Sequence, residues 1–230
     1  DRMYIANATG CSSIWGNSSP STPYTVNAKG QGPAWDNSLF EDNAEFGYGM
    51  LLAQNAIRDR LKKEVEELAE KDASVKDVAQ EWLDTFSVGA TNGAATDKLV
   101  AALADKTDEL SKDLVKNKDF LAKKSQWIFG GDGWAYDIGF GGLDHVLASG
   151  KDINVMVFDT EVYSNTGGQS SKSTPTGAVA QFAAGGKDTG KKDLPGIAMS
   201  YGYVYVAHIN MGGDMQQTVK AIAEAEAYPG

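Results

Sequence analysis

The chain has 230 residues, of which 42% are hydrophobic, 10% aromatic and 23% charged, and these values exclude a largely disordered protein. Its net charge of −10 disfavours nucleic acid and anionic membrane as partners, because both need a basic surface. No apolar run approaches the roughly 20 residues that span a bilayer. The single cysteine excludes an internal disulfide and favours a reducing compartment, so we expect a cytoplasmic protein.

The first 125 residues contain two segments of different composition. The first 50 residues are rich in Gly, Ser, Asn, Pro and Thr, which predicts a loop-rich N-terminal segment. Lys, Glu, Asp, Ala and Leu then dominate, with apolar residues at helical spacing, which predicts a helical insertion over about 55–125 with solvated charged faces. Its expected local features are a capping box at Ser74 and Asp77, a loop over 89–95 and a helix over 99–124.

The remainder of the chain alternates short apolar runs with helical segments, which is typical of an α/β domain. Residues 127–129, 153–158 and 203–209 are apolar on both faces, as expected for strands of a parallel sheet flanked by helices. Helices are expected over about 136–147 and from Asp214 to residue 227. The sequence therefore predicts one α/β domain over the whole chain, interrupted by the helical insertion.

The strongest local motif is Gly130-Gly131-Asp132-Gly133, which follows the first of these strands and precedes a helix. Glycines there permit positive φ and a close approach of backbone to ligand, and the helix start offers free N–H groups to a phosphate. Asp132 stands at the carboxyl end of the strand, where open α/β sheets bind ligands, and can reach a metal ion on that phosphate. Taken alone, the motif also fits a tight turn.

The next strand ends at the same edge of the sheet and adds further oxygen ligands. It offers the Thr160 hydroxyl, the Val162 backbone carbonyl and the Asn165 amide. Mg²⁺ prefers a compact octahedron of oxygens, partly from protein and partly from phosphate. Asp132, Thr160 and the Val162 carbonyl could supply three of them from two adjacent loops, and diphosphate oxygens and water the rest.

These elements together resemble the diphosphate motif of thiamine diphosphate enzymes, in which a Gly-Asp-Gly segment, here residues 131–133, is followed by an asparagine, here Asn165 after 31 residues. The spacing is slightly longer than is usual in that family, and Thr166 stands where a second asparagine is common. Three segments are more specific and resemble the pyruvate:ferredoxin (or flavodoxin) oxidoreductases over nearly the whole chain, namely residues 7–16, 37–47 and 160–169.

The resemblance implies a thiamine-diphosphate-binding fold and assigns roles to single residues. Asp132, Thr160 and Val162 match Mg²⁺ ligands, and Asn165 matches a catalytically important residue near the reactive thiazolium. Cys11 matches one of four cysteines that hold a [4Fe–4S] cluster, and the other three fall outside residues 1–230. The stretches that match cofactor contacts comprise Gly131, Asp132, Gly133, Trp134, Thr160, Glu161, Val162, Tyr163, Ser164 and Asn165. The Ser/Thr-Gly tract over 167–177 is either a flexible loop or a segment that lies over the cofactor.

The same resemblance implies the C-terminal domain of a longer enzyme, in agreement with a first residue that is not Met. The implied reaction is oxidative decarboxylation of pyruvate to acetyl-CoA and CO₂, with electrons passing through iron–sulfur clusters to ferredoxin or flavodoxin. The implied partners are pyruvate, coenzyme A, the electron carrier, the other domains of the enzyme and a second subunit in a homodimer. Two alternatives remain: a non-redox thiamine-dependent decarboxylase or carboligase, which would not need Cys11, and a non-catalytic phosphate-binding module.

Overall fold

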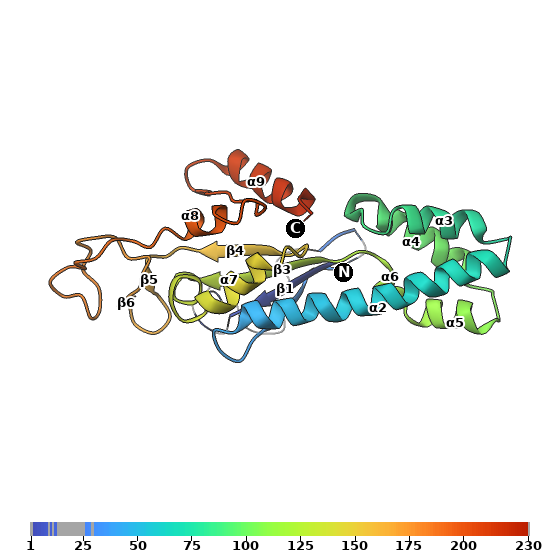
Figure 1. Ribbon diagram of the computed structural model, residues 1–230, viewed down its shortest axis with the longest axis horizontal. Helices are drawn as coiled ribbons and strands as arrows, with labels where there is room; N and C mark the ends of the chain where they lie inside the picture. Colours follow the sequence, from blue (N-terminus) through green and yellow to red (C-terminus); the bar gives the residue numbers. More distant parts are fainter. Residues whose placement is uncertain (1, 9, 11, 13–25, 29, 230) are drawn as a thin grey trace. The chain divides into compact units, whose positions relative to one another are not determined.

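The computed structural model describes residues 2–8, 10, 12, 26–28 and 30–229 (Figure 1). The chain divides into two compact units, which are described separately. The sheet unit lies within residues 3–49 and 126–230, and the helical unit comprises residues 50–125 together with Arg2. Cys11 and much of the segment 7–16 lie outside the described residues.

The sheet unit contains a four-stranded sheet with the strand order β2-β1-β3-β4. Its strands are β1 (Met3–Asn7), β2 (Ala34–Asn37), β3 (Ser125–Gly131) and β4 (Asn154–Phe158). Strand β1 pairs with β2 in parallel and β3 with β4 in parallel, in a register that sets Gly131 opposite Phe158. The expected parallel α/β sheet is confirmed, and the first two predicted strands are β3 and β4 (Figure 1).

The third predicted strand, over residues 203–209, is wrong, because none of its residues adopts strand structure. Its tyrosines point their hydroxyls at neighbouring segments instead of stacking on a sheet. Tyr203 donates a hydrogen bond to the Ala148 carbonyl at 2.8 Å, and Tyr205 donates one to the Glu224 carboxylate at 2.8 Å. Tertiary contacts of this kind readily override the strand preference of aromatic and β-branched residues.

Strand β3 forms the centre of the apolar core of the sheet unit. Ile128 is fully buried, and Phe129 makes edge-to-face contacts with Trp35 and Phe158 at centroid distances of 5.6 and 5.5 Å. Gly47, in the first part of helix α2 (Asn43–Lys71), packs directly on this core. A Cβ atom there would lie 2.6 Å from the Ile128 side chain, so only glycine lets the helix come so close.

The C-terminal half contains the remaining helices of the sheet unit. A π-helical segment, η1 (Gly133–Ile138), leads into α7 (Phe140–Ala148), so the predicted helix over 136–147 is present but divided at Gly139. Helices α8 (Leu194–Met199) and α9 (Met215–Ala227) complete the unit. The predicted start of α9 is confirmed, since the Asp214 side chain accepts a hydrogen bond from the Gln217 backbone N–H at 2.9 Å.

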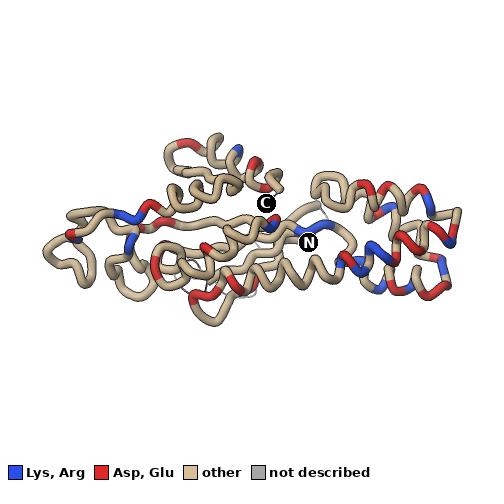
Figure 2. The backbone as a smooth tube through the Cα atoms, in the orientation of Figure 1, with Lys and Arg blue, Asp and Glu red and all other residues tan. Residues whose placement is uncertain are grey.

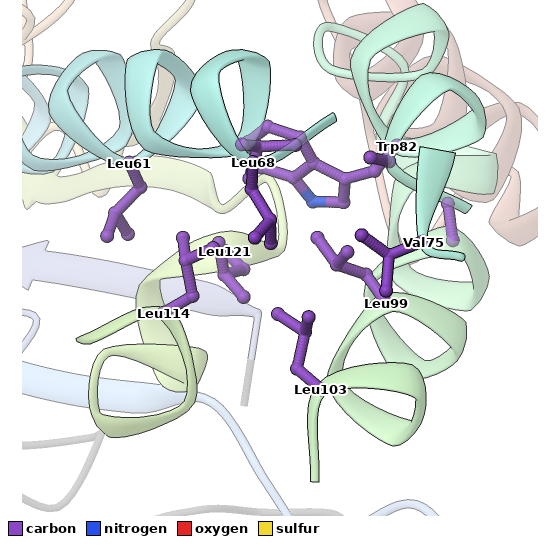
Figure 3. Close-up of a cluster of buried hydrophobic side chains, with 11 residues drawn as sticks. Leu61, Leu68, Val75, Trp82, Leu99, Leu103, Leu114 and Leu121 are labelled. Carbon is purple, nitrogen blue, oxygen red and sulfur yellow. The ribbon is translucent and has the colours of Figure 1, made fainter. Parts of the chain in front are cut away.

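The helical unit has a core of its own. It consists of the later part of α2 with α3 (Lys76–Asp84), α4 (Gly89–Leu103), α5 (Glu109–Lys116) and α6 (Lys118–Leu121). Trp82 is fully buried at the centre, and its indole N–H donates a hydrogen bond to the Thr96 hydroxyl at 3.1 Å. Figure 3 shows the leucines and the valine that surround it: Leu61, Leu68, Val75, Leu99, Leu103, Leu114 and Leu121.

Three local predictions for this unit are wrong. Residues 89–95 start helix α4 rather than form a loop, and the Arg2 guanidinium occupies the space that a Cβ atom at Gly93 would fill. The helix predicted over 99–124 stops at Leu103 and is replaced by α5 and α6. The capping box is absent from α3, because Ser74 bonds to Asp72 and the N-cap residue Val75 has no side-chain cap.

Charge is distributed unevenly along the chain. Figure 2 shows charged residues crowded along the helices of the helical unit and sparser in the sheet unit. Many of the former pair with one another, such as Lys98 with Glu81 at 2.6 Å and Arg60 with Asp113 at 2.7 Å. Within the described residues, no helix is both long enough and apolar enough to cross a membrane.

Candidate functional site

The candidate site lies where β3 and β4 end, at the carboxyl edge of the sheet. Because Gly131 is opposite Phe158 in the parallel register, the residues that follow each strand, Asp132 and Asp159, emerge side by side. Asp132 is fully buried, whereas Asp159 is exposed. The edge of an open α/β sheet at which ligands bind thus carries one buried carboxylate.

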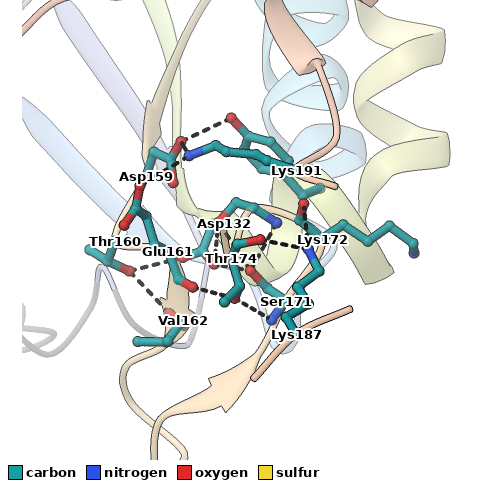
Figure 4. A network of polar contacts seen from close by, with 12 residues as sticks. Asp132, Asp159, Thr160, Glu161, Val162, Ser171, Lys172, Thr174, Lys187 and Lys191 are labelled. Carbon is teal, nitrogen blue, oxygen red and sulfur yellow. Dashed lines mark hydrogen bonds and ion pairs between the residues drawn. The ribbon is translucent and has the colours of Figure 1, made fainter. Parts of the chain in front are cut away.

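Three oxygen atoms from the two loops meet at this edge (Figure 4). The Thr160 hydroxyl lies 2.8 Å from Asp132 Oδ1 and 3.1 Å from the Val162 carbonyl oxygen. Glu161 lies between Thr160 and Val162 and has a φ of 65°. This sharp turn directs the Val162 carbonyl back toward the Thr160 hydroxyl. Left-handed backbone at a residue other than glycine is uncommon and concentrates at functional sites.

This group of oxygens suits a Mg²⁺ ion. Mg²⁺ holds oxygen ligands octahedrally at about 2.0–2.1 Å, so neighbouring ligand atoms are about 2.9 Å apart. The separations of 2.8 and 3.1 Å around Thr160 match that spacing. The described residues contain no cluster of three or more His, Cys, Asp or Glu side chains that could hold a metal ion. One carboxylate and two neutral oxygens therefore leave positions for the oxygens of a diphosphate.

The charge of Asp132 is not balanced by a cation within the described part of the chain, where only hydroxyl groups contact its carboxylate. Burial, and then the charge of Asp132, raise the pKa of the Glu41 carboxyl to about 7. Unlike Asp132, the neighbouring carboxylates are paired with a cation, because Lys191 pairs with Asp159 at 2.6 Å and with Glu161 at 3.4 Å. The electrostatic environment of Asp132 is therefore one that a divalent cation would stabilise.

The glycines of the motif serve packing rather than unusual backbone geometry. Neither Gly130 nor Gly133 has positive φ. A Cβ atom at Gly130 would lie 2.3 Å from the Trp134 ring, and one at Gly133 would lie 2.3 Å from the Tyr163 ring. The positive φ that glycine permits is therefore not used at either position, and the glycines let two aromatic rings close over the loop.

The tract over 167–177, which the sequence left undecided, contacts the buried Asp132 carboxylate. Its first residues complete a short hairpin, in which β5 (Val162–Tyr163) pairs with β6 (Gln169–Ser170). Ser171 and Ser173 then turn inward, are buried, and donate hydrogen bonds to Asp132 Oδ2 at 2.6 and 3.0 Å. Sequence reasoning missed both as site residues, and the only signal was the run of hydroxyl side chains after Asn165.

Comparison with known proteins now identifies the family. Residues 89–229 match the family described as "Thiamine pyrophosphate enzyme, C-terminal TPP binding domain". The chain belongs to this family of thiamine pyrophosphate-binding domains. The matched region includes every residue of the Asp132, Thr160 and Val162 group, and Cys11 precedes it.

Curated relatives match this thiamine pyrophosphate-binding domain over its full length. The pyruvate-flavodoxin oxidoreductase of Klebsiella pneumoniae is 59% identical and the pyruvate:ferredoxin oxidoreductase of Moorella thermoacetica is 58% identical, each over 100% of this chain. The mitochondrial pyruvate dehydrogenase [NADP(+)] of Euglena gracilis is 54% identical, again over 100% of the chain. The chain spans 20% of the length of the first two proteins and 13% of the third.

The other residues predicted to contact the cofactor differ in their solvent exposure. Trp134 is fully buried, whereas Ser164 and Asn165 are exposed in the turn that joins β5 to β6. Tyr163 lies against Gly133, and burial followed by the charge of Asp137 raises the pKa of its hydroxyl to about 12. Cys11 lies outside the described residues.

Proposed function

We propose that the protein containing this domain oxidatively decarboxylates pyruvate in the presence of coenzyme A, giving acetyl-CoA and CO₂, and passes the electrons through iron–sulfur clusters to ferredoxin or flavodoxin. The observation that carries the proposal is the Asp132, Thr160 and Val162 oxygen group, at the carboxyl edge of the sheet. It occurs in a chain that is 58–59% identical to two oxidoreductases named for pyruvate.

In this proposal each predicted site residue has a defined role. Asp132, Thr160 and the Val162 carbonyl hold a Mg²⁺ ion that binds the diphosphate of the cofactor. Asn165 faces the reacting centre, and the remaining contacts orient the cofactor: Gly131, Gly133, Trp134, Glu161, Tyr163 and Ser164. When bound, thiamine diphosphate supplies a thiazolium that accepts the electron pair of the breaking carbon–carbon bond. The residues of this chain bind, orient and shield it.

Partners beyond the cofactor belong to the rest of the protein. We propose that coenzyme A binds to other domains of the protein, which lie outside this chain. We also propose that the protein is a cytoplasmic homodimer. The Euglena gracilis relative is named for NADP⁺, although this region of it is 54% identical to the chain. This supports the proposal that other domains determine the electron acceptor, while the thiamine site is shared by this chain and its relatives.

A titration of the intact protein tests the proposal most directly. Thiamine diphosphate should bind in the presence of Mg²⁺ and bind much more weakly after chelation, because Asp132 would then lack the ion through which it would hold the diphosphate. Calorimetry with ADP under the same conditions serves as the control for a general phosphate-binding module. Equal affinity for ADP, or no pyruvate-dependent reduction of either ferredoxin or flavodoxin in the presence of coenzyme A, would contradict the proposed function.

A second prediction concerns the iron–sulfur cluster. A [4Fe–4S] cluster needs four thiolates, and Cys11 is the only cysteine of the chain, so we propose that Cys11 is one ligand and that three lie outside residues 1–230. A Cys11→Ser variant of the intact protein should lose or damage one cluster while retaining its affinity for thiamine diphosphate. Electron paramagnetic resonance of the reduced variant measures the first effect, and a full set of native cluster signals would refute the assignment.

A further inference from the structure

Both oxygens of the Asp132 carboxylate are engaged, but by different partners. Oδ1 faces the Thr160 hydroxyl and, beyond it, the Val162 carbonyl. Oδ2 accepts hydrogen bonds from the hydroxyls of Ser171 and Ser173 at 2.6 and 3.0 Å. Within the predicted metal site, therefore, one oxygen faces the other proposed ligand oxygens and the other is held by two buried donors.

The two hydroxyls lie 3.0 Å from each other as well as against Oδ2, and either serine oxygen could be the donor in the contact between them. Each carries a single proton, so with both protons on Oδ2 the carboxylate oxygen accepts from both serines. Ser171 Oγ in turn accepts a hydrogen bond from the Ser173 backbone N–H at 3.1 Å, which holds this oxygen beside the carboxylate. The two serines are 5% and 0% exposed, so water cannot replace a bond that is broken.

The backbone that carries these serines is itself anchored. The Ser171 N–H donates to the Thr174 hydroxyl at 2.9 Å, and that hydroxyl donates to the Glu161 carbonyl, next to Val162. Lys187 Nζ donates to the carbonyls of Thr174 and Lys172 at 2.7 and 3.3 Å (Figure 4). The serine loop, residues 171–174, is thus fixed to the same turn that presents the metal-facing carbonyl.

We propose that Ser171 and Ser173 are positioning residues that hold Asp132 as a one-oxygen ligand and thereby make the site favour Mg²⁺ over Ca²⁺. This inference rests on the proposed Mg²⁺ site and adds its ion selectivity. Ca²⁺ takes six to eight oxygens and often binds both oxygens of a carboxylate, whereas Mg²⁺ requires an octahedron of single oxygens. Turning Oδ2 toward an ion would break both serine bonds in a buried site, which disfavours the geometry of Ca²⁺.

The test measures the affinity of the intact protein for MgCl₂ and for CaCl₂ by calorimetry, at saturating thiamine diphosphate. In Ser171→Ala, Ser173→Ala and the double variant, Mg²⁺ affinity should fall by about 10–100-fold, the usual effect of removing a partner that orients a metal ligand. Ca²⁺ affinity should change much less, because the freed carboxylate can bind through both oxygens. The ratio of the two affinities should therefore fall by at least about tenfold in the double variant.

Ser170→Ala is the matched control, since Ser170 is the neighbouring residue and belongs to β6 rather than to the serine loop. It should leave the affinity ratio at the wild-type value. Equal losses of Mg²⁺ and Ca²⁺ affinity, or an unchanged ratio, would overturn the inference while leaving the metal site itself standing. A wild-type protein whose binding of thiamine diphosphate does not depend on Mg²⁺ would instead overturn both the proposed site and the inference. If the double variant does not fold, the ratio in the two single variants decides.

Discussion

An Asp132→Ala variant of the intact protein is expected to lose Mg²⁺-dependent binding of thiamine diphosphate. Asp132 is the only carboxylate in the proposed oxygen group, and its charge supplies the strongest contact to the ion. We expect affinity to fall by more than about 100-fold, since even partners that only orient a metal ligand cost 10–100-fold. Calorimetric titration with thiamine diphosphate at fixed Mg²⁺ measures the loss, and unchanged affinity would refute the assignment.

Thermal unfolding gives a second measure of the same variant. A ligand that binds only the folded state at 100 times its Kd stabilises that state by about 2.7 kcal/mol. Adding Mg²⁺ and thiamine diphosphate should therefore raise the Tm of the wild-type protein and leave that of Asp132→Ala unchanged. Asp159→Asn is the matched control, because Asp159 directly follows the neighbouring strand but is not part of the proposed oxygen group. It pairs with Lys191 and accepts a hydrogen bond from the Tyr136 hydroxyl. This variant should retain the Tm increase.

The strands that position the site could be predicted because their residues leave little choice. Strand β3 contains three consecutive apolar residues before a glycine, and β4 alternates β-branched and apolar residues, so each indicates a buried strand. Strands β1 and β2 were not predicted. Strand β1 contains an apolar run over residues 3–6, but it lies in a segment whose composition indicates loops, and β2 is only four residues long and contains Asp36 and Asn37. Both depend on pairing with strands that are distant in the sequence, in the order β2-β1-β3-β4.

The predicted loop over 89–95 and the predicted strand over 203–209 are wrong where glycine and tyrosine make tertiary contacts. Gly93 indicates a loop by composition, yet it lies inside α4, where the Arg2 guanidinium occupies the space beside it. The segment over 203–209 has the residues of a strand, but the hydroxyls of Tyr203 and Tyr205 bond to α7 and α9. Both segments contact residues that are distant in the sequence, and neither periodicity nor propensity contains those contacts.

In the candidate site, too, residues close to a predicted strand end could be identified, whereas residues brought in from distant segments could not. Asp132, Thr160 and Val162 could be selected because they lie within four residues of the predictable ends of β3 and β4, and the structure places their oxygens together. Ser171 and Ser173 could not be selected, because hydroxyl residues in a Gly-rich tract are equally typical of an exposed loop. Their contacts with Asp132 span 39 and 41 residues, and the β5–β6 hairpin lies in the intervening chain.

Replacement of Asn165 should affect the reaction more than cofactor binding. Asn165 is exposed in the turn between β5 and β6, three residues after the proposed metal-facing carbonyl of Val162. An amide there can donate a hydrogen bond to an oxygen that gains negative charge during decarboxylation, without touching the diphosphate. In Asn165→Ala we expect turnover of pyruvate to fall roughly 10–1000-fold, with little change in affinity for thiamine diphosphate.

Thr166→Ala separates this effect from a general disturbance of the turn. The Thr166 hydroxyl bonds to the Gln169 side chain at 2.6 Å, within the same hairpin, and has no proposed role in the reaction. Steady-state rates of electron-carrier reduction, measured at saturating thiamine diphosphate, should therefore be near the wild-type value in Thr166→Ala and low in Asn165→Ala. Equal losses in the two variants would assign the effect to the turn. A normal turnover with reduced cofactor affinity in Asn165→Ala would show that the amide acts in binding, because a group that stabilises only the transition state cannot change the affinity of the ground state.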